Sequence, residues 1–440
     1  MPEISFTLPR GMKDIGPQEM AKRQWVTDKI LRVICRYGFQ LVEPSTLEHL
    51  ETLEAKSGPT IRDEIYFFKD KADRNLGLRF DLTVGMTRMV AGRSDLPEPI
   101  KLAAIAGMWR YDEPQFARYR HFYQWDLEIY GTKEPIADAE IIAASIDILE
   151  ELGLREYEVL ISSRQLVDGY FGAIGITDQA QREQAIRVVD KVRKTRREEL
   201  VARFSEIGVK DKTLGKVLDF ITLRGTPSEA LARLETLCQD ALFQTGLANM
   251  KKLVHALESF GKIDKCKLDM SVVRGLDYYD GIVFEAYDKG GEDIGAILGG
   301  GRYDRLGSLY GKHDLPCTGV AGGMERLFLS LERAHLIPES EAPVKIYVVA
   351  ANDTVRSHVL GLVQRIREAG VPADVDLKNR SLKNQLQYAD ALKIPYAVIL
   401  GPREVEQQLV TVRDMRTRQE QRMAQSEFRN WLARLSASNM

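Results

Sequence analysis

The sequence predicts an α+β fold, in which an antiparallel-sheet domain carries a helical insertion and is followed by a small α/β domain. Two extended segments, 100–111 and 120–131, are separated by a loop of several residues, as in an antiparallel hairpin. Residues 171–261 change to charge-rich helical sequence. Strand and helix patterns then alternate from residue 344 onward, which is typical of an α/β domain.

Composition places the chain among water-soluble globular proteins, with 440 residues, 29% of them charged, and a net charge of −2. No apolar run approaches the ~20 residues that span a bilayer, and Met1 to Met12 lack the apolar core of a signal peptide. The four cysteines are scattered without a Cys-x-x-Cys pair, which argues against a structural zinc site or a disulfide framework. We therefore expect a cytoplasmic protein with no membrane segment and no resident metal.

Composition also shifts along the chain. We predict a first domain at 1–330 with its helical insertion at about 171–261, a linker at 331–343 and a second domain at 344–440. The second domain holds fifteen Lys and Arg against ten Asp and Glu, a net charge of +5 that leaves −7 for the rest of the chain. A basic domain on an acidic body suggests a polyanionic partner, but some soluble domains are mildly basic without one.

The first domain opens with an amphipathic helix at 15–37, which Gly38 ends, and an extended segment at 39–44. A second helix is predicted at 137–152.

Strand patterns in this domain separate polar from apolar side chains. A predicted strand at 78–83 places Arg79, Asp81 and Thr83 on one face. The second hairpin strand gathers its ionic and amide groups on one face: Arg120, Gln124, Asp126 and Glu128. Its other face carries apolar groups: Tyr123, Trp125, Leu127 and Ile129. A solvated surface would explain residues 78–83 alone, whereas the strands together favour a sheet that lines a charged cleft.

Residues 274–285 combine one permanent cation, Arg274, with two phenols, Tyr278 and Tyr279, and a strand-forming run at 282–284. An arginine beside aromatic rings at the end of a strand can hold an anion. The alternative is a polar hairpin whose tyrosines pack on a sheet edge.

Two glycine-rich stretches follow. Residues 294–304 contain three consecutive glycines, which allow close backbone approach but do not match a dinucleotide-binding fingerprint. Residues 318–328 predict a strand that passes into a helix, with Arg326 at the start of the helix.

The insertion is rich in basic residues between Arg182 and Arg203, which suits either a solvated helix face or contact with a nucleic acid. The second domain is predicted to contain strands at 345–351, 371–375, 396–400 and 409–413, and helices at 354–369, 381–392 and 420–435.

If these strands share one sheet, a single cleft receives several arginines, carboxylates and phenols. The arginines are Arg79, Arg110, Arg120, Arg274 and Arg326, and the other groups are Asp81, Asp112, Glu128, Tyr278 and Tyr279. Converging arginines suit a triphosphate, and the carboxylates suit an ammonium group or Mg²⁺. Because no Walker or protein-kinase motif is present, the residues alone predict an anion-binding antiparallel-sheet enzyme and leave nucleotide dependence open.

The order of these motifs resembles that of class II aminoacyl-tRNA synthetases, and most closely the histidyl-tRNA synthetase family. Pro44 lies where the first motif of the family has a proline, residues 109–128 resemble the second motif and residues 319–326 the third. The run Arg274-Gly-Leu-Asp-Tyr-Tyr279 resembles a signature of the histidine enzymes. Residues 376–383 and 410–414 are similar to its anticodon-binding domain, so the resemblance covers nearly the whole chain.

The resemblance implies ligation of L-histidine to its tRNA through a histidyl-adenylate, with ATP and Mg²⁺ as the substrate complex, by a homodimer. The implied catalytic residues are Arg274, Arg110 and Arg326. The implied histidine-binding residues are Asp81, Leu82, Thr83, Arg110, Gln124, Glu128, Arg274, Tyr278 and Tyr279. The implied ATP-binding residues are Arg110, Asp112 and Arg326, and the implied tRNA-binding residues are Gln115, Arg118, Lys378, Arg380 and Lys383.

Two departures from the family pattern bear on these roles. Glu113 stands where many members have a basic residue, and Phe116-Ala117 replaces a lysine-glycine type pair in the loop that meets the acceptor end of tRNA. Asp81 replaces the glutamate of another branch, which still leaves a carboxylate for the substrate amine.

Three other functions are open to such a chain: a silent paralogue that regulates histidine biosynthesis, a class II synthetase for another amino acid, and a non-enzymatic nucleic-acid-binding module. The intact Arg274 signature, Arg110, Arg326 and the full terminal domain argue against the first. Glu128 beside two tyrosines argues against the second, and the third leaves the arginine-carboxylate cleft unexplained.

Overall fold

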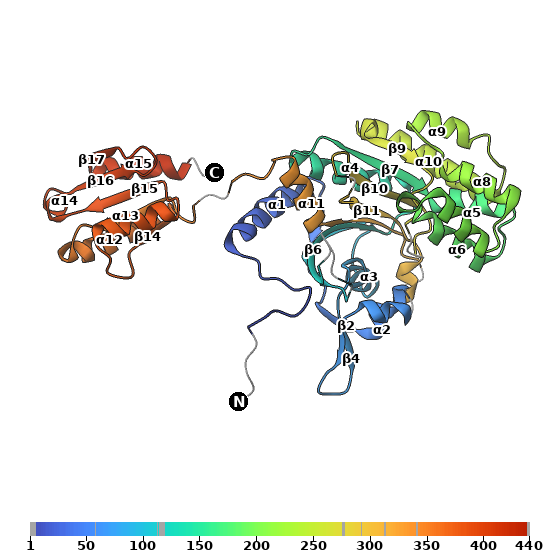
Figure 1. Cartoon of the computed structure of the whole chain (residues 1–440), viewed down its shortest axis with the longest axis horizontal. Coiled ribbons are helices and arrows are strands. Elements are labelled where there is room, and N and C mark those ends of the chain that lie inside the picture. The colour runs from blue at the N-terminus through green and yellow to red at the C-terminus, as the bar shows by residue number, and fades with distance from the viewer. Residues whose placement is uncertain are drawn as a thin grey trace. The chain divides into compact units, whose positions relative to one another are not determined.

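A computed structural model describes residues 6–57, 59–111, 113, 119–274, 278–291, 293–311, 314–339 and 342–437. The chain divides into two compact units, Met1–Pro338 and Glu339–Met440, each with its own large sheet (Figure 1). Within these ranges no helix is long and apolar enough to cross a membrane. The predicted α+β class is confirmed.

The first unit is built on a mixed sheet that has nine strands in the part of the chain described. Six neighbouring strands are antiparallel and form its centre: β5 (Ile100–Trp109), β6 (His121–Tyr130), β12 (Cys317–Gly323), β11 (Ala296–Arg302), β10 (Ile282–Asp288) and β7 (Tyr157–Ser163). Short strands extend both edges: β1 (Gln40–Leu41) pairs with β5, and β9 (Cys266–Asp269) and β8 (Arg224–Gly225) continue beyond β7. The predicted hairpin is therefore confirmed, with Trp109 opposite His121.

One face of this sheet is covered by helices. Trp125 and Ile129 of β6 join a core with apolar residues of α1 (Pro17–Arg36) and α4 (Pro135–Glu151). The helix α11 (Met324–Arg333), which follows β12 directly, adds Leu327 to the same core. The apolar face predicted for β6 thus faces these helices.

The other face packs on α3 (Thr83–Ala91) and carries a second core that includes Tyr130, Val283 and Tyr303 (Figure 1). The buried carboxylate of Glu128 lies on this side. Side chains alternate along a strand, so the polar positions of β6 all point toward α3 and its neighbours.

The inserted segment is helical and shares its core with the sheet. Phe171, Phe220 and Phe243 belong to the same apolar cluster as Val159 of β7. Its elements are α5 (Arg164–Ala173), α6 (Gln179–Val189), η2 (Val192–Lys194), α7 (Arg197–Glu206), α8 (Asp211–Ile221), α9 (Pro227–Leu234) and α10 (Ala241–Ser259), and the short turn η3 (Ile263–Lys265) leads back to the sheet.

The strand predicted at 78–83 is wrong at residues 79–83 and holds only for Leu78. Strand β4 (Asn75–Leu78) ends at Leu78, and α3 begins at Thr83. Arg79 is buried, and its guanidinium donates to the carbonyl oxygens of Gly107 at 2.9 Å and Pro44 at 2.5 Å. Because backbone acceptors fix this cation, Arg79 is a structural residue and does not belong to the predicted cleft.

Strand β4 belongs to a small sheet with β2 (Leu47–His49) and β3 (Phe67–Lys69). Helix α2 (Leu50–Ser57) and the turns η1 (Pro59–Glu64) and η4 (Leu306–Tyr310) complete this region.

The second unit is an α/β domain whose sheet has the order β14-β13-β15-β16-β17. Its elements are β13 (Ile346–Ala350), η5 (Asp353–Val355), α12 (Arg356–Glu368), β14 (Ala373–Val375), α13 (Leu382–Ala391), β15 (Tyr396–Leu400), α14 (Pro402–Glu406), β16 (Leu409–Asp414), β17 (Glu420–Ala424) and α15 (Gln425–Ala437). The helix predicted at 420–435 is confirmed at 425–435, as α15, but is wrong at 420–424, where the chain forms β17 against β16. Glu420, Gln421 and Arg422 are exposed on this edge strand, so its sequence shows no strand-like alternation.

We expect Gly322→Ala to destabilise the first unit. Gly322 lies opposite Trp125, and a Cβ at this position would overlap the buried indole ring. Overpacking of this kind costs about 1–3 kcal/mol, so the free energy of unfolding measured in urea should fall by that amount. Gly323→Ala is the matched control, because no atom lies within 4 Å of a Cβ there. Equal stabilities of the two variants would contradict this packing.

Candidate active site

The carboxylate of Glu128 lies at the centre of the polar face of β6, and only 1% of the residue is exposed. The Thr83 hydroxyl donates a hydrogen bond to its Oε1 at 2.8 Å, and the Tyr303 hydroxyl donates to its Oε2. Gly319 stands opposite Glu128 in β12, where a Cβ would overlap the carboxylate. The glycine-rich third motif thus provides the space in which the acid lies.

Three tyrosines pack beside this carboxylate. The rings of Tyr278 and Tyr279 lie 4.4 Å apart between centroids, and Tyr303 meets them edge-on at 5.7 and 6.2 Å. Burial and the nearby charge of Glu128 raise the pKa of Tyr303, so its hydroxyl remains a donor. Tyr303 was not predicted as a site residue, although it directly follows the run of glycines and Arg302 that the sequence shows.

Arg274 lies over the Tyr279 ring, with the centre of its guanidinium 5.6 Å from the ring centroid. Its Nη1 donates to Glu285 Oε1 at 3.0 Å. A Cβ on Gly299 of β11 would overlap this Nη1, so the strand leaves room for the cation. The φ of Arg274 is 51°, in the left-handed region, which a bulky residue adopts only when its surroundings hold it there.

Tyr278 lies close to several of these groups. Burial raises its pKa; Arg274 acts in the opposite direction, and the negative charges of Asp81 and Glu128 add to the increase. The predicted histidine-binding residues Asp81, Glu128 and Arg274 therefore each lie within electrostatic range of Tyr278, which packs beside Tyr279.

Of the predicted histidine-binding residues, Asp81 and Leu82 lie just before α3, and Gln124 lies on β6. Asp81 accepts a hydrogen bond from the Val84 amide at 3.0 Å, and Leu82 is fully buried. Gln124 lies on β6 between Ala106 of β5 and Gly323 of β12, four residues before Glu128.

The other two predicted catalytic arginines lie on different elements, one after β5 and one in the first turn of α11. Arg110 follows β5; it donates from Nε to the Phe80 carbonyl at 3.0 Å and lies over the Phe122 ring at 5.0 Å. Arg326 begins α11 and donates from Nη1 to the Ala296 carbonyl of β11 at 3.0 Å.

A cleft of about 730 Å³ contains Arg326 together with Glu285, the partner of Arg274. Arg274 and Arg326 thus lie close to the same cleft. Arg110 follows β5, which is separated from β11 by β6 and β12. The sequence predicted that Arg120 shares one cleft with these arginines. In the structure the centre of its guanidinium lies 4.2 Å from the centroid of the Tyr111 ring.

Part of the predicted second motif lies outside the described residues, namely Asp112, Gln115, Arg118 and the Phe116-Ala117 pair. Glu113 is described and forms an exposed ion pair with Arg10 at 2.8 Å.

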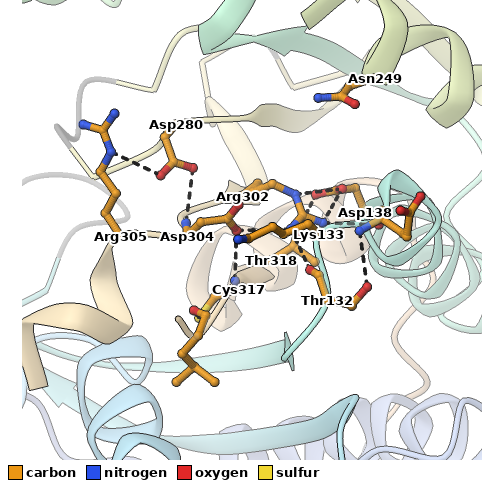
Figure 2. Close-up of polar contacts among 12 residues, drawn as sticks. Thr132, Lys133, Asp138, Asn249, Asp280, Arg302, Asp304, Arg305, Cys317 and Thr318 are labelled. Atoms are coloured by element: carbon orange, nitrogen blue, oxygen red, sulfur yellow. Dashed lines mark hydrogen bonds and ion pairs between the residues drawn. The ribbon is translucent and has the colours of Figure 1, made fainter. Parts of the chain in front are cut away.

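A buried ionic network around Arg302 and Asp138 includes the residues on either side of Tyr303 in sequence (Figure 2). Arg302, at the end of β11, donates to Asp138 Oδ2 at 2.7 and 3.1 Å and to Asp304 Oδ1 at 3.1 Å. The Thr318 hydroxyl donates to the other Asp138 oxygen at 2.7 Å. This network fixes the backbone on both sides of Tyr303.

Asp280 connects the network to the segment that carries Tyr278 and Tyr279. Its amide donates to the Arg302 carbonyl at 3.1 Å, and its Oδ1 accepts from the Asp304 amide at 3.2 Å (Figure 2). Neither Asp280 nor Arg302 was predicted as a site residue, since their partners are distant in sequence.

Comparison with known proteins adds an independent observation to this geometry. A family model described as histidyl-tRNA synthetase matches residues 11–327, and one described as an anticodon binding domain matches residues 345–435. The chain belongs to the histidyl-tRNA synthetase family.

Individual members of this family match the sequence of this chain over nearly its whole length. A histidine–tRNA ligase of Thermococcus kodakarensis is 37% identical over 411 residues, which cover 93% of this chain and 94% of that protein. One of Haloarcula marismortui is 34% identical and covers 92% of this chain and 93% of its own.

Solved structures of the family share the fold. The crystal structure of histidyl-tRNA synthetase from Nostoc sp. has a TM-score of 0.85 at 26% identity and covers 98% of this chain and all of its own. A Bacillus halodurans structure titled as an ATP phosphoribosyltransferase regulatory subunit/histidyl-tRNA synthetase covers 91% of this chain and 98% of its own, with a TM-score of 0.74 at 23% identity, and shows the fold alone.

In the second unit, the predicted tRNA-binding residues lie around the start of α13. Lys378 and Lys383 are exposed. Arg380 donates to Asp376 Oδ1 at 2.9 Å and lies over the Tyr388 ring at 4.2 Å. Arg380 therefore has an internal structural role that the two lysines lack.

The environment of Asp280 predicts a pH-dependent stability. Burial and the neighbouring Asp304 carboxylate raise the pKa of Asp280 from 3.8 to about 6. A carboxyl whose pKa is higher in the folded than in the unfolded protein stabilises the fold at low pH, and this contribution is lost as the pH rises from about 4 through about 6. Asp280→Asn carries no charge, so it should be more stable than the wild type at pH 7.5 by about 1–2 kcal/mol, with little difference at pH 4.

Urea unfolding as a function of pH measures this difference. Asp314→Asn, at a side chain 76% exposed, controls for the loss of one negative charge. A constant difference between Asp280→Asn and the wild type across this pH range would contradict the prediction.

Proposed function

We propose that this protein attaches L-histidine to its tRNA in an ATP-dependent reaction that passes through histidyl-adenylate and releases AMP and pyrophosphate. The observation that carries the proposal is the buried Glu128 carboxylate, in one site with the Arg274 guanidinium and three tyrosines. Such a site provides an acceptor for an imidazole N–H and a cation for a carboxylate.

Glu128 and Tyr279 are proposed to recognise the imidazole ring. An apolar amino acid of similar size would leave the Glu128 carboxylate without a substrate donor, which penalises its binding. Asp81, Thr83 and Gln124 are proposed to bind the substrate ammonium, with Leu82 and Tyr278 forming the wall of the pocket.

Arg274 is proposed to stabilise the reacting groups of the first step. An oxygen of the histidine carboxylate attacks the α-phosphorus of ATP, and the bond from this phosphorus to pyrophosphate breaks. Among the described residues, Arg274 Nε has no hydrogen-bond acceptor although it is buried. This N–H can therefore donate to the substrate carboxylate or the α-phosphate as charge develops.

Arg110 and Arg326 are proposed to hold the ATP phosphates, and Asp112 is a further predicted ATP-binding residue. ATP enters as its Mg²⁺ complex. Mg²⁺ in such sites is bound by phosphates with one or two carboxylates. The described residues contain no group of three or more His, Cys, Asp or Glu side chains that could hold a metal ion.

In the second step, a terminal ribose hydroxyl of the tRNA attacks the carbonyl carbon of the adenylate, and AMP leaves. Gln115 and Arg118 are predicted to contact the acceptor end. In the second unit, exposed Lys378 and Lys383 are proposed to bind the tRNA backbone, and Arg380 to support the loop between them.

A homodimer in the cytoplasm is proposed as the active form. Strand β1 is the edge strand of the described sheet, and Leu41 on it is 53% exposed. An apolar side chain on an open sheet edge favours a partner chain there.

A regulatory paralogue in histidine biosynthesis is the alternative. A protein that binds histidine without activating it has no need of phosphate-binding arginines. The presence of Arg110 and Arg326, together with the anticodon-binding match at 345–435, supports the ligase.

Pyrophosphate exchange into ATP, measured with each of the twenty amino acids, tests the proposal. We expect exchange with histidine and at most a background rate with the others. No exchange with histidine would overturn the ligase proposal.

Replacing Glu128 by Gln should raise the KM for histidine about ten- to a hundredfold, with little effect on the KM for ATP, because a hydrogen bond to a charged group is lost. Pyrophosphate exchange measures both constants, and the unfolding midpoint shows that the variant is folded. Equal changes in both KM values would contradict the imidazole assignment.

A double substitution, Lys378→Gln with Lys383→Gln, should weaken tRNA binding and reduce its dependence on salt. Two lost phosphate contacts should reduce the slope of log K against log salt by about 1.4 for single-stranded RNA. Lys393→Gln is the matched control, because Lys393 is exposed just past the opposite end of α13 from Lys383. The RNA surface would lie elsewhere if the control and the double variant bound tRNA alike.

A further inference from the structure

The 730 Å³ cleft is formed by two parts of the first unit that are far apart in sequence. One wall comes from the helical insertion and includes Asp190, Val192 and Arg193. The other comes from the main sheet and α11 and includes Tyr287 and Arg326. The insertion therefore lies against the strand that follows the Arg274 segment.

A line of contacts crosses this cleft from the insertion to Arg274. The guanidinium of Arg193, on η2, lies 4.8 Å from the centroid of the Tyr287 ring. The Tyr287 hydroxyl donates to Glu285 Oε2 at 2.5 Å, and Arg274 Nη1 donates to Glu285 Oε1 at 3.0 Å. Both oxygens of Glu285 are thus fixed, one by Tyr287 and the other by Arg274.

The backbone of β10, the protonation of Tyr287 and the ion pair of Arg193 all favour these contacts. The pairing of β10 with β11 shifts register between Ala286 and Tyr287, and a bulge of this kind re-aims a side chain. Burial and the Glu285 charge raise the pKa of Tyr287, so it stays protonated and donates. Arg193 is itself held by Asp269, to which it donates at 2.6 Å.

We propose that Arg193 and Tyr287 are positioning residues for adenylate formation: Arg193 holds the Tyr287 ring, and Tyr287 holds Glu285 in the orientation that aims Arg274 at the substrate. The inserted helices thereby contribute to the first chemical step. This inference rests on the proposed function, because it assigns Arg274 its role in that step.

Tyr287→Phe removes the hydroxyl and keeps the ring for Arg193. We expect the kcat of histidine-dependent pyrophosphate exchange to fall about tenfold, since a misaligned charge loses part of its effect on the transition state. The KM values for histidine and ATP should change little. Arg193→Ala should lower kcat by a similar factor, and Arg193→Lys, which keeps a cation beside the ring, should restore part of it.

The double variant Arg193→Ala with Tyr287→Phe distinguishes this line of contacts from two unrelated losses. It should be no slower than the slower single variant, because both residues act through Glu285. Arg224→Ala is the matched control: Arg224 lines the same cleft and approaches Asp269 at 3.5 Å, and its ion pairs within the described part of the chain are with Asp269 and Glu158. This control should keep the wild-type kcat.

The outcomes separate the two proposals. If the wild type shows no histidine-dependent exchange, the proposed function fails. If the wild type is active and Tyr287→Phe keeps its full kcat, or if the effects of Arg193→Ala and Tyr287→Phe multiply in the double variant, the positioning proposal alone fails. An equal loss of kcat in Arg224→Ala would also overturn it, since the effect would then belong to the cleft as a whole.

Discussion

Burying the Glu128 carboxylate costs free energy unless donors satisfy its oxygens. Thr83 at the start of α3 and Tyr303 after β11 supply these donors, so the acid fixes two distant segments against β6. Tyr303 in turn packs on Tyr278 and Tyr279, which bring Arg274 to the same face of the sheet. The proposed substrate pocket is therefore organised around one carboxylate that remains able to accept a further hydrogen bond.

Glycines make this arrangement sterically possible. A side chain at Gly319 would occupy the position of the Glu128 carboxylate, and one at Gly299 would occupy that of the Arg274 guanidinium. The central strands β11 and β12 thus lack side chains where the site needs space. Around this site, the Arg302 network fixes the backbone beside Tyr303, and Tyr287 donates to Glu285. Under the positioning proposal, chemistry in the pocket depends on such contacts outside it.

The sequence predicted the parts of the fold that follow a simple periodicity. The β5–β6 hairpin and its two faces follow from alternation, and the strand into α11 follows from its glycines and apolar spacing. Residues 79–83 were misassigned because Arg79 is fixed by backbone carbonyls, which no sequence pattern reveals. Strand β17 was misassigned because its exposed residues are all polar. Asp138 and Arg302 pair across 164 positions, and Arg193 reaches Tyr287 only through the fold. Such partners cannot be found by reading along the chain.

In the proposed complex, Glu128 accepts an imidazole N–H while Arg274 binds the carboxylate of the same molecule. A crystal structure with L-histidine and a non-hydrolysable ATP analogue tests this most directly. We expect a ring nitrogen within about 3 Å of a Glu128 oxygen and a guanidinium nitrogen of Arg274 at a similar distance from the histidine carboxylate. Histidine bound with its ring away from Glu128, or with Arg274 contacting only Glu285, would contradict it.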